Sequence, residues 1–456
     1  MPPQLALALC LAAVVYLLKI ERKQNPEVTR ALWVPTVWVL YIASRPIQLW
    51  LKTESLNSDA SSPLDMAVLI AFILSASMIL SRRKGRWAGA LKENPWLIAL
   101  FAFMAVSILW SVIPAASFKR LIREVLAVMM ALAVFSEPSP RLAIESVLRR
   151  GTLILIPFSL VLIKYFPDYG VEYGRWSGDQ EWLGVAQQKN SLALICVISA
   201  IFLIWSLFRR WRKDRPGGWR YQTPADVVLL LIALYLLGGP DHSLFYSATS
   251  IYAFLAGLLV AAGIYAREKA GRRVKAGWLM ALTAFIVLFG VVTVFISGST
   301  IGFFASTAGR DATLTGRTQV WASLMPVVMA SPLIGRGFGG FWTSRTRDAF
   351  KISGAHSGYL DVLIGTGLAG LLLVALFLLS SCRKAHRELS RDLYWGLLWI
   401  WYLVLILVHN IGESSVDTFT AQSTAILLFF TICSSAKTHQ GPKTREVPDG
   451  AEPAGA

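Results

Sequence analysis

Apolar runs long enough to cross a bilayer dominate this chain and restrict its fold more than any other feature. A helix of about 20 mostly apolar residues spans the hydrocarbon core of a membrane, and backbone groups in lipid must be hydrogen-bonded within their own segment. Hydrophobic residues make up 55% of the 456 residues and charged residues only 16%, whereas soluble domains average about 25% charged. The sequence therefore predicts an all-α, polytopic transmembrane helical bundle.

We expect about 12 to 14 spans, joined mostly by short polar loops. The first apolar run has neither a basic segment before it nor a small-residue cleavage site, so we interpret it as a retained span. The expected spans cover residues 5–20, 31–44, 66–80, 95–112, 121–135, 151–166, 191–208, 226–237, 250–265, 277–296, 362–380, 393–408 and 421–434.

This pattern divides the chain into four parts. An N-terminal bundle of about 10 spans covers residues 1–296, and a long polar loop at 297–361 follows it. A second group of spans occupies residues 362–434. The tail, residues 435–456, is polar, so we expect it to be disordered and cytoplasmic.

Positive charge is distributed in a way typical of a membrane protein. The formal net charge is +17, and the basic residues cluster in every second loop, at 82–86, 209–220, 267–275 and 383–387. Cytoplasmic loops carry such an excess of lysine and arginine, whereas a nucleic-acid-binding domain concentrates it on one face. We therefore expect contact with membrane lipids and not with nucleic acid. With the basic loops inside, residues 297–361 and the loops around Arg175 and Glu413 face outward.

The outward loops carry more arginine than topology explains, and anion binding is the obvious reason, since a guanidinium binds phosphate oxygens through two N–H groups at once. The alternative for each arginine is contact with solvent or lipid headgroups. The main candidates are Arg175, Arg310 and Arg317, with Arg120, Arg123 and Arg336 behind them.

Other outward side chains have two interpretations each. His356 is either a general base, as an imidazole can be near neutral pH, or a structural residue, and Asp361 is placed to orient it. Glu413 either orients an arginine or binds a sugar, or it is a solvated loop residue. Trp321, one helical turn after Arg317, either stacks on a sugar ring or belongs to the aromatic belt of the membrane surface.

Motifs for metal-driven or nucleotide-driven chemistry are missing from the sequence. It has no P-loop lysine motif, no HExxH and no Asp-x-Asp pair in the outer loops. The glycine-rich segment GRGFGG at 335–340 has no strand-helix-strand context for binding a dinucleotide. The four cysteines lie outside the outer loops and match no metal spacing. We therefore expect no metal, no cofactor and no disulfide framework.

Five segments in one order resemble the O-antigen ligase and polymerase superfamily of bacterial inner-membrane proteins, especially its exopolysaccharide-polymerase branch. They extend from residue 107 to residue 370, and the hydropathy profile extends the likeness to nearly the whole chain. The segments read SILWSVIPAASFKR, GRWSGDQEWLGVAQQKNSLAL, AGRDATLTGRTQVW, SPLIGRGFGGFW and AHSGYLDVLIGTGLAG.

The resemblance implies a reaction and a location. Such proteins transfer a glycan from undecaprenyl pyrophosphate to an acceptor hydroxyl on the periplasmic side of the inner membrane, without a metal or a nucleotide. The acceptor is a lipid A–core in ligases and another lipid-linked repeat in polymerases. Partners expected from the family include a chain-length regulator and other polysaccharide-assembly proteins. Ligase and polymerase stay open. The alternative function is a lipid-linked oligosaccharide flippase or polysaccharide transporter, and a non-catalytic membrane scaffold is the third class.

The resemblance also assigns roles to residues. It implies that Arg175 and Arg317 hold the pyrophosphate and that His356 takes the proton of the acceptor hydroxyl. The segment QQKNS departs from the family, which often has histidine or proline before the asparagine. Here Lys189 precedes Asn190, so either Lys189 adds charge beside the donor or the donor sugar differs.

Overall fold

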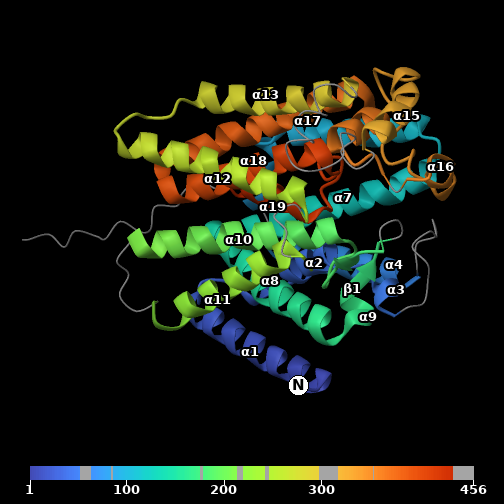
Figure 1. The fold of residues 1–456 in the computed structure, drawn as a ribbon. Coiled ribbons are helices and arrows are strands. Elements are labelled where there is room, and N and C mark those ends of the chain that lie inside the picture. The colour runs from blue at the N-terminus through green and yellow to red at the C-terminus, as the bar shows by residue number, and fades with distance from the viewer. Residues whose placement is uncertain are drawn as a thin grey trace, which may run out of the picture.

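The computed structural model describes residues 1–51, 63–83, 86–174, 178–212, 219–241, 246–296, 317–352 and 354–434. Within these ranges the chain is almost entirely helical, and the long helices run side by side across the molecule (Figure 1). The two described strands, β1 (Val171–Tyr173) and β2 (Gln180–Trp182), form a short antiparallel hairpin in which Val171 pairs with Trp182. The predicted all-α class is confirmed.

The helices of the first half alternate between long segments and short turns. They are α1 (Pro3–Gln24), a 3-10 turn at Arg30–Leu32, α2 (Trp33–Ala43), α3 (Ile47–Trp50), α4 (Pro63–Arg82), α5 (Arg86–Lys92), α6 (Pro95–Ser107), a 3-10 turn at Ile108–Trp110, α7 (Pro114–Phe135), α8 (Pro140–Tyr165), α9 (Pro167–Gly170) and α10 (Lys189–Arg212).

The second half contains the longest helix of the described chain and two short helices near one end of the bundle. Its elements are α11 (Trp219–Gly238), α12 (Ala248–Lys269), α13 (Ala276–Phe295), α15 (Arg317–Met329), α16 (Ser344–Phe350), α17 (Gly358–Arg391), α18 (Leu393–Gly412) and α19 (Gln422–Cys433). In Figure 1, α15 and α16 lie at the same end of the bundle as β1 and α9.

Eight described helices are long and apolar enough to cross a membrane: α1, α4, α8, α10, α12, α13, α17 and α18. Four shorter apolar helical stretches, at Arg30–Ala43, Pro95–Trp110, Thr223–Gly238 and Gln422–Cys433, accompany them. Helix α7 is 22 residues long but is not among the eight; its first half carries Lys119, Arg120, Arg123 and Glu124. The polytopic class is confirmed, and 12 to 14 spans stays a prediction.

Helix α18 forms the centre of the bundle and contacts α10, α12, α13 and α17. Its aromatic side chains are tied to neighbouring backbones: the Trp401 indole donates to the Phe254 carbonyl at 3.1 Å, and the Tyr402 hydroxyl donates to the Ile198 carbonyl at 2.8 Å. A side chain at Gly257 would meet the Trp401 ring at 2.4 Å, so the glycine permits α12 to approach closely. The middle of α18 is therefore held against α10 and α12.

Helix α17 differs from the predicted span at 362–380. It begins at Gly358, inside the stretch expected to be a loop, and is interrupted at Gly367, where φ is +65°. The backbone groups freed by the interruption bond to the segment before α16: Leu368 N–H donates to the Pro332 carbonyl at 2.8 Å, and Arg336 N–H donates to the Ile364 carbonyl at 2.8 Å. A Cβ on Gly367 would lie 2.5 Å from Leu333, so this contact requires glycine.

Candidate active site

The carboxylate of Glu413 stands at the end of α18 and is held there by a well-bonded turn. Glu413 is 7% exposed, its N–H donates to the His409 carbonyl, and its own carbonyl accepts from Gly358 N–H at 3.1 Å. The side-chain oxygen of Asn410 accepts the backbone N–H groups of the following residues, Ser415 and Val416. These bonds fix the direction in which the segment leaves the helix.

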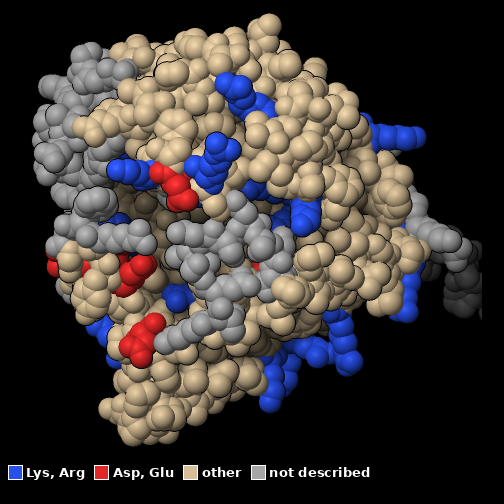
Figure 2. All heavy atoms as spheres, turned by 90° about the vertical axis from the view of Figure 1, so that its right-hand side faces the viewer, with Lys and Arg blue, Asp and Glu red and all other residues tan. Residues whose placement is uncertain are grey.

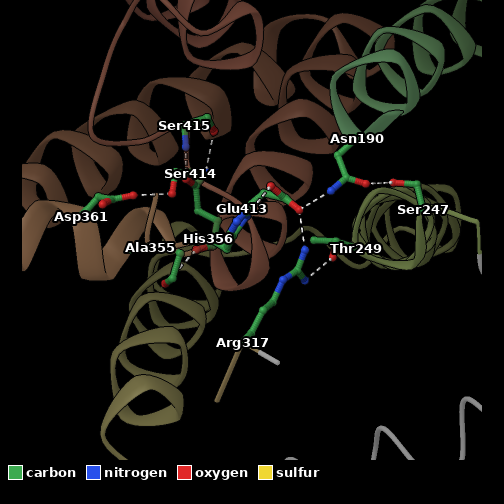
Figure 3. Close-up of polar contacts among 12 residues, drawn as sticks. Asn190, Ser247, Thr249, Arg317, Ala355, His356, Asp361, Glu413, Ser414 and Ser415 are labelled. Atoms are coloured by element: carbon green, nitrogen blue, oxygen red, sulfur yellow. Dashed lines mark hydrogen bonds and ion pairs between the residues drawn. The ribbon is translucent and has the colours of Figure 1, made fainter. Parts of the chain in front are cut away.

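Three elements bring donors to one oxygen of this carboxylate or beside it (Figure 3). Arg317, the first residue of α15, donates from Nη2 to Glu413 Oε1 at 2.5 Å and from Nη1 to Thr249 Oγ1 at 3.1 Å. Asn190, in the first turn of α10, donates to the same Oε1 at 2.6 Å. Ser247 Oγ in turn donates to Asn190 Oδ1 at 3.3 Å.

His356 approaches the other oxygen. Its Nδ1 lies 3.7 Å from Glu413 Oε2, and its side chain is 32% exposed, so the imidazole stands at the edge of the site. Among the described residues no group bonds to Nε2. The backbone of His356 has φ of +51°, a conformation that costs a non-glycine residue about 1–3 kcal/mol and is common at functional sites.

The charged groups in this cluster stabilise one another. Burial raises the pKa of Glu413, but the hydrogen bond from His356 and the positive charge of Arg317 outweigh it, so the net pKa is lowered. Glu413 is therefore ionised at neutral pH and holds both basic side chains. The Arg317 guanidinium has five N–H donors. Its bonds to Glu413 and Thr249 use two of them, so further N–H groups can bind an anion.

Two comparisons with known proteins show what this chain is similar to. Residues 243–375 match the family model described as O-Antigen ligase. The chain is also similar to the "Exopolysaccharide production protein ExoQ" of Rhizobium meliloti (strain 1021), with 25% identity over 309 residues. That alignment covers 65% of this chain and 66% of the relative, just under two thirds of its length.

Both matches make the chain similar to the O-antigen ligase and polymerase superfamily. The segment matched by the O-antigen ligase model contains Thr249, Arg317 and His356, whereas Asn190 and Glu413 lie outside it. The polar cluster is therefore assembled from the family segment and from helices on either side of it.

Trp321 and Asp361 support the cluster from within. Trp321 is only 1% exposed, and its indole donates to the carbonyl of Ala355 at 2.9 Å, directly before His356. Asp361, one turn into α17, accepts from the Trp342 indole at 2.6 Å and from the Ser414 hydroxyl. Both residues are placed to position the segment that carries His356.

The remaining candidates lie apart from Glu413 or outside the described chain. Arg120 donates to the carbonyls of Gly339 and Trp342, and Arg123 lines a separate cavity described below. Arg336 follows the Gly335 turn beside the interruption of α17. Lys189 pairs with Glu181 at 2.5 Å. The two other arginines predicted from the sequence, Arg175 and Arg310, fall outside the described residues.

Sequence reasoning missed Thr249 and Ser247, which belong to the loop and first turn of α12. Nothing in their local sequence separates them from other hydroxyl residues, since their role depends on the packing of α12 against α18. In the part of the chain that the structure describes, no group of three His, Cys, Asp or Glu side chains is placed to hold a metal ion. Figure 2 shows this end of the molecule, where basic and acidic side chains surround a hollow.

Proposed function

We propose that this chain is an inner-membrane glycosyltransferase of polysaccharide assembly. It transfers a glycan from undecaprenyl pyrophosphate to a hydroxyl of an acceptor on the periplasmic side, as an O-antigen ligase or as an O-antigen or exopolysaccharide polymerase. The observation that carries the proposal is the Glu413 carboxylate, which joins a cation suited to phosphate, Arg317, to a potential base, His356. The relative's name, exopolysaccharide production protein, is consistent with this proposal.

The proposed reaction is a single displacement at the anomeric carbon. His356 Nε2 takes the proton of the acceptor hydroxyl, and the hydroxyl oxygen forms the new bond to the anomeric carbon as the bond to pyrophosphate breaks. The pyrophosphate leaves with the electron pair and the configuration is inverted. A positioned base contributes about 10²- to 10⁴-fold in rate, and Glu413 stabilises the imidazolium as it forms.

Arg317 stabilises the charge that grows on the leaving pyrophosphate. Fixed donors aimed at developing charge are among the strongest catalytic effects, because they need no reorganisation during the reaction. The bonds to Glu413 and Thr249 fix the guanidinium before the donor arrives. Arg175 and Arg310, expected from the sequence to face the same side, are the candidates for a second contact with the pyrophosphate.

The periplasmic location of the site follows from the basic loops, and the division of the chain at residues 297, 362 and 435 stays part of the proposal. A flippase for lipid-linked oligosaccharide is the alternative function. Charged side chains along a transport path are expected to face water or substrate. Several buried charges of this bundle are instead paired with each other, as in Arg150 with Glu21 at 3.0 Å and Arg149 with Asp226 at 2.8 Å.

The test is transfer by purified protein in nanodiscs, supplied with an undecaprenyl-pyrophosphate-linked repeat and an acceptor. The proposal expects a lengthened or transferred glycan together with free undecaprenyl pyrophosphate. Movement of the donor across vesicle membranes without any new glycosidic bond would show a flippase instead. Products on a second lipid-linked repeat identify a polymerase, and products on lipid A–core identify a ligase.

A further inference from the structure

A second polar site lies beside the Glu413 cluster, in a cavity of about 390 Å³. This volume is within the range of about 300–1,000 Å³ that is usual for small-molecule pockets. Helices α6, α7 and α17 form its walls, and the segments 338–342 and 416–420 close it. Its chemically distinctive lining residues are Arg120, Arg123, Arg347, Glu124, Asp361 and Asp417.

Two of the three arginines in the lining are available to a ligand. Arg120 is bonded to the carbonyls of Gly339 and Trp342 and holds the wall of the cavity. By contrast, no described residue forms a hydrogen bond or an ion pair with the guanidinium of Arg123 or of Arg347. Arginine side chains directed at a shared cavity are suited to a carboxylate or a phosphate, which each can bind through two N–H groups.

The three acidic side chains differ in the same way. Glu124 is 3% exposed and is bonded to Thr418 Oγ1 and Phe419 N–H, both at 2.5 Å, so it holds the 416–420 segment. Asp361 is bonded to Trp342 and Ser414. Asp417 alone of the three keeps a buried oxygen, Oδ1, for which the described residues supply no hydrogen-bond partner.

Asp417 also alters the charge balance of the lining. Its pKa is raised well above the usual carboxyl range, mainly by burial and then by the negative charges of Asp361 and Glu124. Three guanidiniums therefore face three carboxyl groups, of which Asp417 keeps its proton to a higher pH than usual, and a protonated Asp417 favours an anion in the cavity. It also offers a carboxylic acid that can donate to, and accept from, a sugar hydroxyl.

Aromatic side chains complete the lining. Phe341 and Trp342 are half-buried, pack edge to face at 4.9 Å between ring centres, and both border the cavity. Amphipathic aromatic rings with a few fixed polar groups are the usual composition of a small-molecule site. A phosphatidic acid headgroup would use the arginines but carries no hydroxyl for Asp417 Oδ1. A phosphatidylglycerol headgroup carries hydroxyls, so competition by anionic lipid is one arm of the experiment.

We propose that this cavity binds an acidic sugar residue of the acceptor glycan, with its anionic group on Arg123 and Arg347 and a hydroxyl on Asp417. The inference rests on the proposed glycosyl transfer, since it names the acceptor of that reaction. The hydrogen bond between Ser414 and Asp361 links this cavity to the Glu413 cluster. Ser414 directly follows Glu413, and Asp361 lies five residues after His356, in the first turn of α17. An acceptor residue held here is therefore adjacent to the proposed base.

The experiment compares two trisaccharides that differ at one sugar: one ends in glucuronic acid and the other in glucose. Binding of each is titrated by calorimetry to the full chain in nanodiscs of neutral lipid. The test variants are Arg123→Gln and Arg347→Gln. The matched controls are Lys119→Gln on α7 and Arg345→Gln on α16, which remove a positive charge from an exposed position outside the lining.

We expect the acidic probe to bind at least about 10-fold more tightly than the neutral probe, as the loss of one charged hydrogen bond implies. Each test variant should remove most of that preference, and each control should keep it. Equal binding of both probes, no binding of the acidic probe at about 10 mM, or equal loss in the controls would overturn the proposal. If anionic lipid displaces the acidic probe from the wild type and neither sugar probe is preferred, the cavity binds lipid headgroups and not glycan.

Donor binding separates this inference from the proposed function. Arg123→Gln and Arg347→Gln should bind undecaprenyl pyrophosphate as the wild type does, because Arg317 is unchanged. If acidic-sugar binding is absent while transfer proceeds, only the acceptor site is wrong. If transfer is absent while the acidic preference and its loss in both variants persist, the cavity binds glycan but the proposed reaction is wrong.

Discussion

Glu413 binds Arg317 through one carboxylate oxygen and faces His356 through the other, at 2.5 and 3.7 Å. Glu413 and Arg317 are 96 residues apart in sequence, and each comes from the end of a different helix. The carboxylate therefore couples the proposed phosphate-binding group to the proposed base.

Glu413→Gln tests that coupling. The amide keeps the shape of the side chain but loses the charge that orients Arg317 and stabilises the imidazolium. We expect transfer to fall about 10- to 100-fold, as for loss of a charged hydrogen bond. Asp348→Asn, which changes an exposed carboxylate on α16, is the control and should transfer normally. Wild-type transfer by Glu413→Gln would make Glu413 a structural residue only.

Arg317→Lys separates charge from geometry. Lysine keeps one positive charge, but it cannot reach Glu413 and Thr249 together and lacks the planar fork that fits pyrophosphate. Donor affinity is expected to drop about 10- to 100-fold, while expression and insertion continue. The measurement is binding of undecaprenyl pyrophosphate in nanodiscs, with Arg345→Lys as the control. An unchanged affinity would leave Arg310 as the better candidate for the phosphate contact.

The sequence was sufficient for the class of fold but not for the site. Runs of apolar residues predicted the long helices, because backbone N–H and C=O groups in lipid must form hydrogen bonds within the protein. The resemblance supplied His356 and Arg317, since both lie in segments with a recognisable order. It did not supply the bonds of Arg317 to Glu413 and Thr249, or that of Asn190 to Glu413. These bonds depend on how α10, α12, α15 and α18 pack.

The start of α17 shows a second limit. Polar residues up to Asp361 indicated a loop, but the helix already begins at Gly358. The Gly358 N–H, which has no partner within the helix, donates to the Glu413 carbonyl at 3.1 Å. The interruption at Gly367 was equally hidden. A glycine in an apolar run is common, and only the segment 332–336 packed against it shows why it is needed.

Asp417→Asn gives a pH-dependent prediction. Because folding raises the pKa of Asp417, the folded protein holds this proton more tightly than the unfolded chain, and the wild type loses stability as pH rises above the ordinary carboxyl range. The asparagine variant avoids this loss. It should be more stable than wild type by about 1 kcal/mol near neutral pH, and the difference should shrink near pH 4. Thermal unfolding in detergent at both pH values measures it; a constant difference would contradict the assigned cause.

The backbone of His356 allows stability to be separated from activity. At φ of +51°, alanine is strained and glycine is not, so His356→Gly should be more stable than His356→Ala by about 1 kcal/mol. Both variants should lose transfer, because neither has an imidazole. Thermal unfolding compares the two variants, and equal stability would mean that the left-handed conformation relaxes once the side chain is gone.

Topology is tested with single cysteines on α16 and near the C-terminal end of α17. Ser344→Cys, at the start of α16, should react with an impermeant maleimide in cells with a permeabilised outer membrane. Ser390→Cys, in the last turns of α17, should react only after lysis. Cys10 is changed to serine in the background, since it is half-buried while the other three cysteines are buried. The reverse pattern would invert the orientation assigned from the basic loops.

Single-turnover transfer by His356→Ala tests the central claim most directly. The donor is bound first, an excess of acceptor is added, and the rate of the chemical step is compared with wild type, alongside donor affinity. If His356 takes the proton of the acceptor hydroxyl, the rate should fall by roughly 100-fold or more while donor affinity stays within about twofold of wild type. A variant that transfers at the wild-type rate would contradict the assignment and leave Asp361 or Glu413 to be tested as the base.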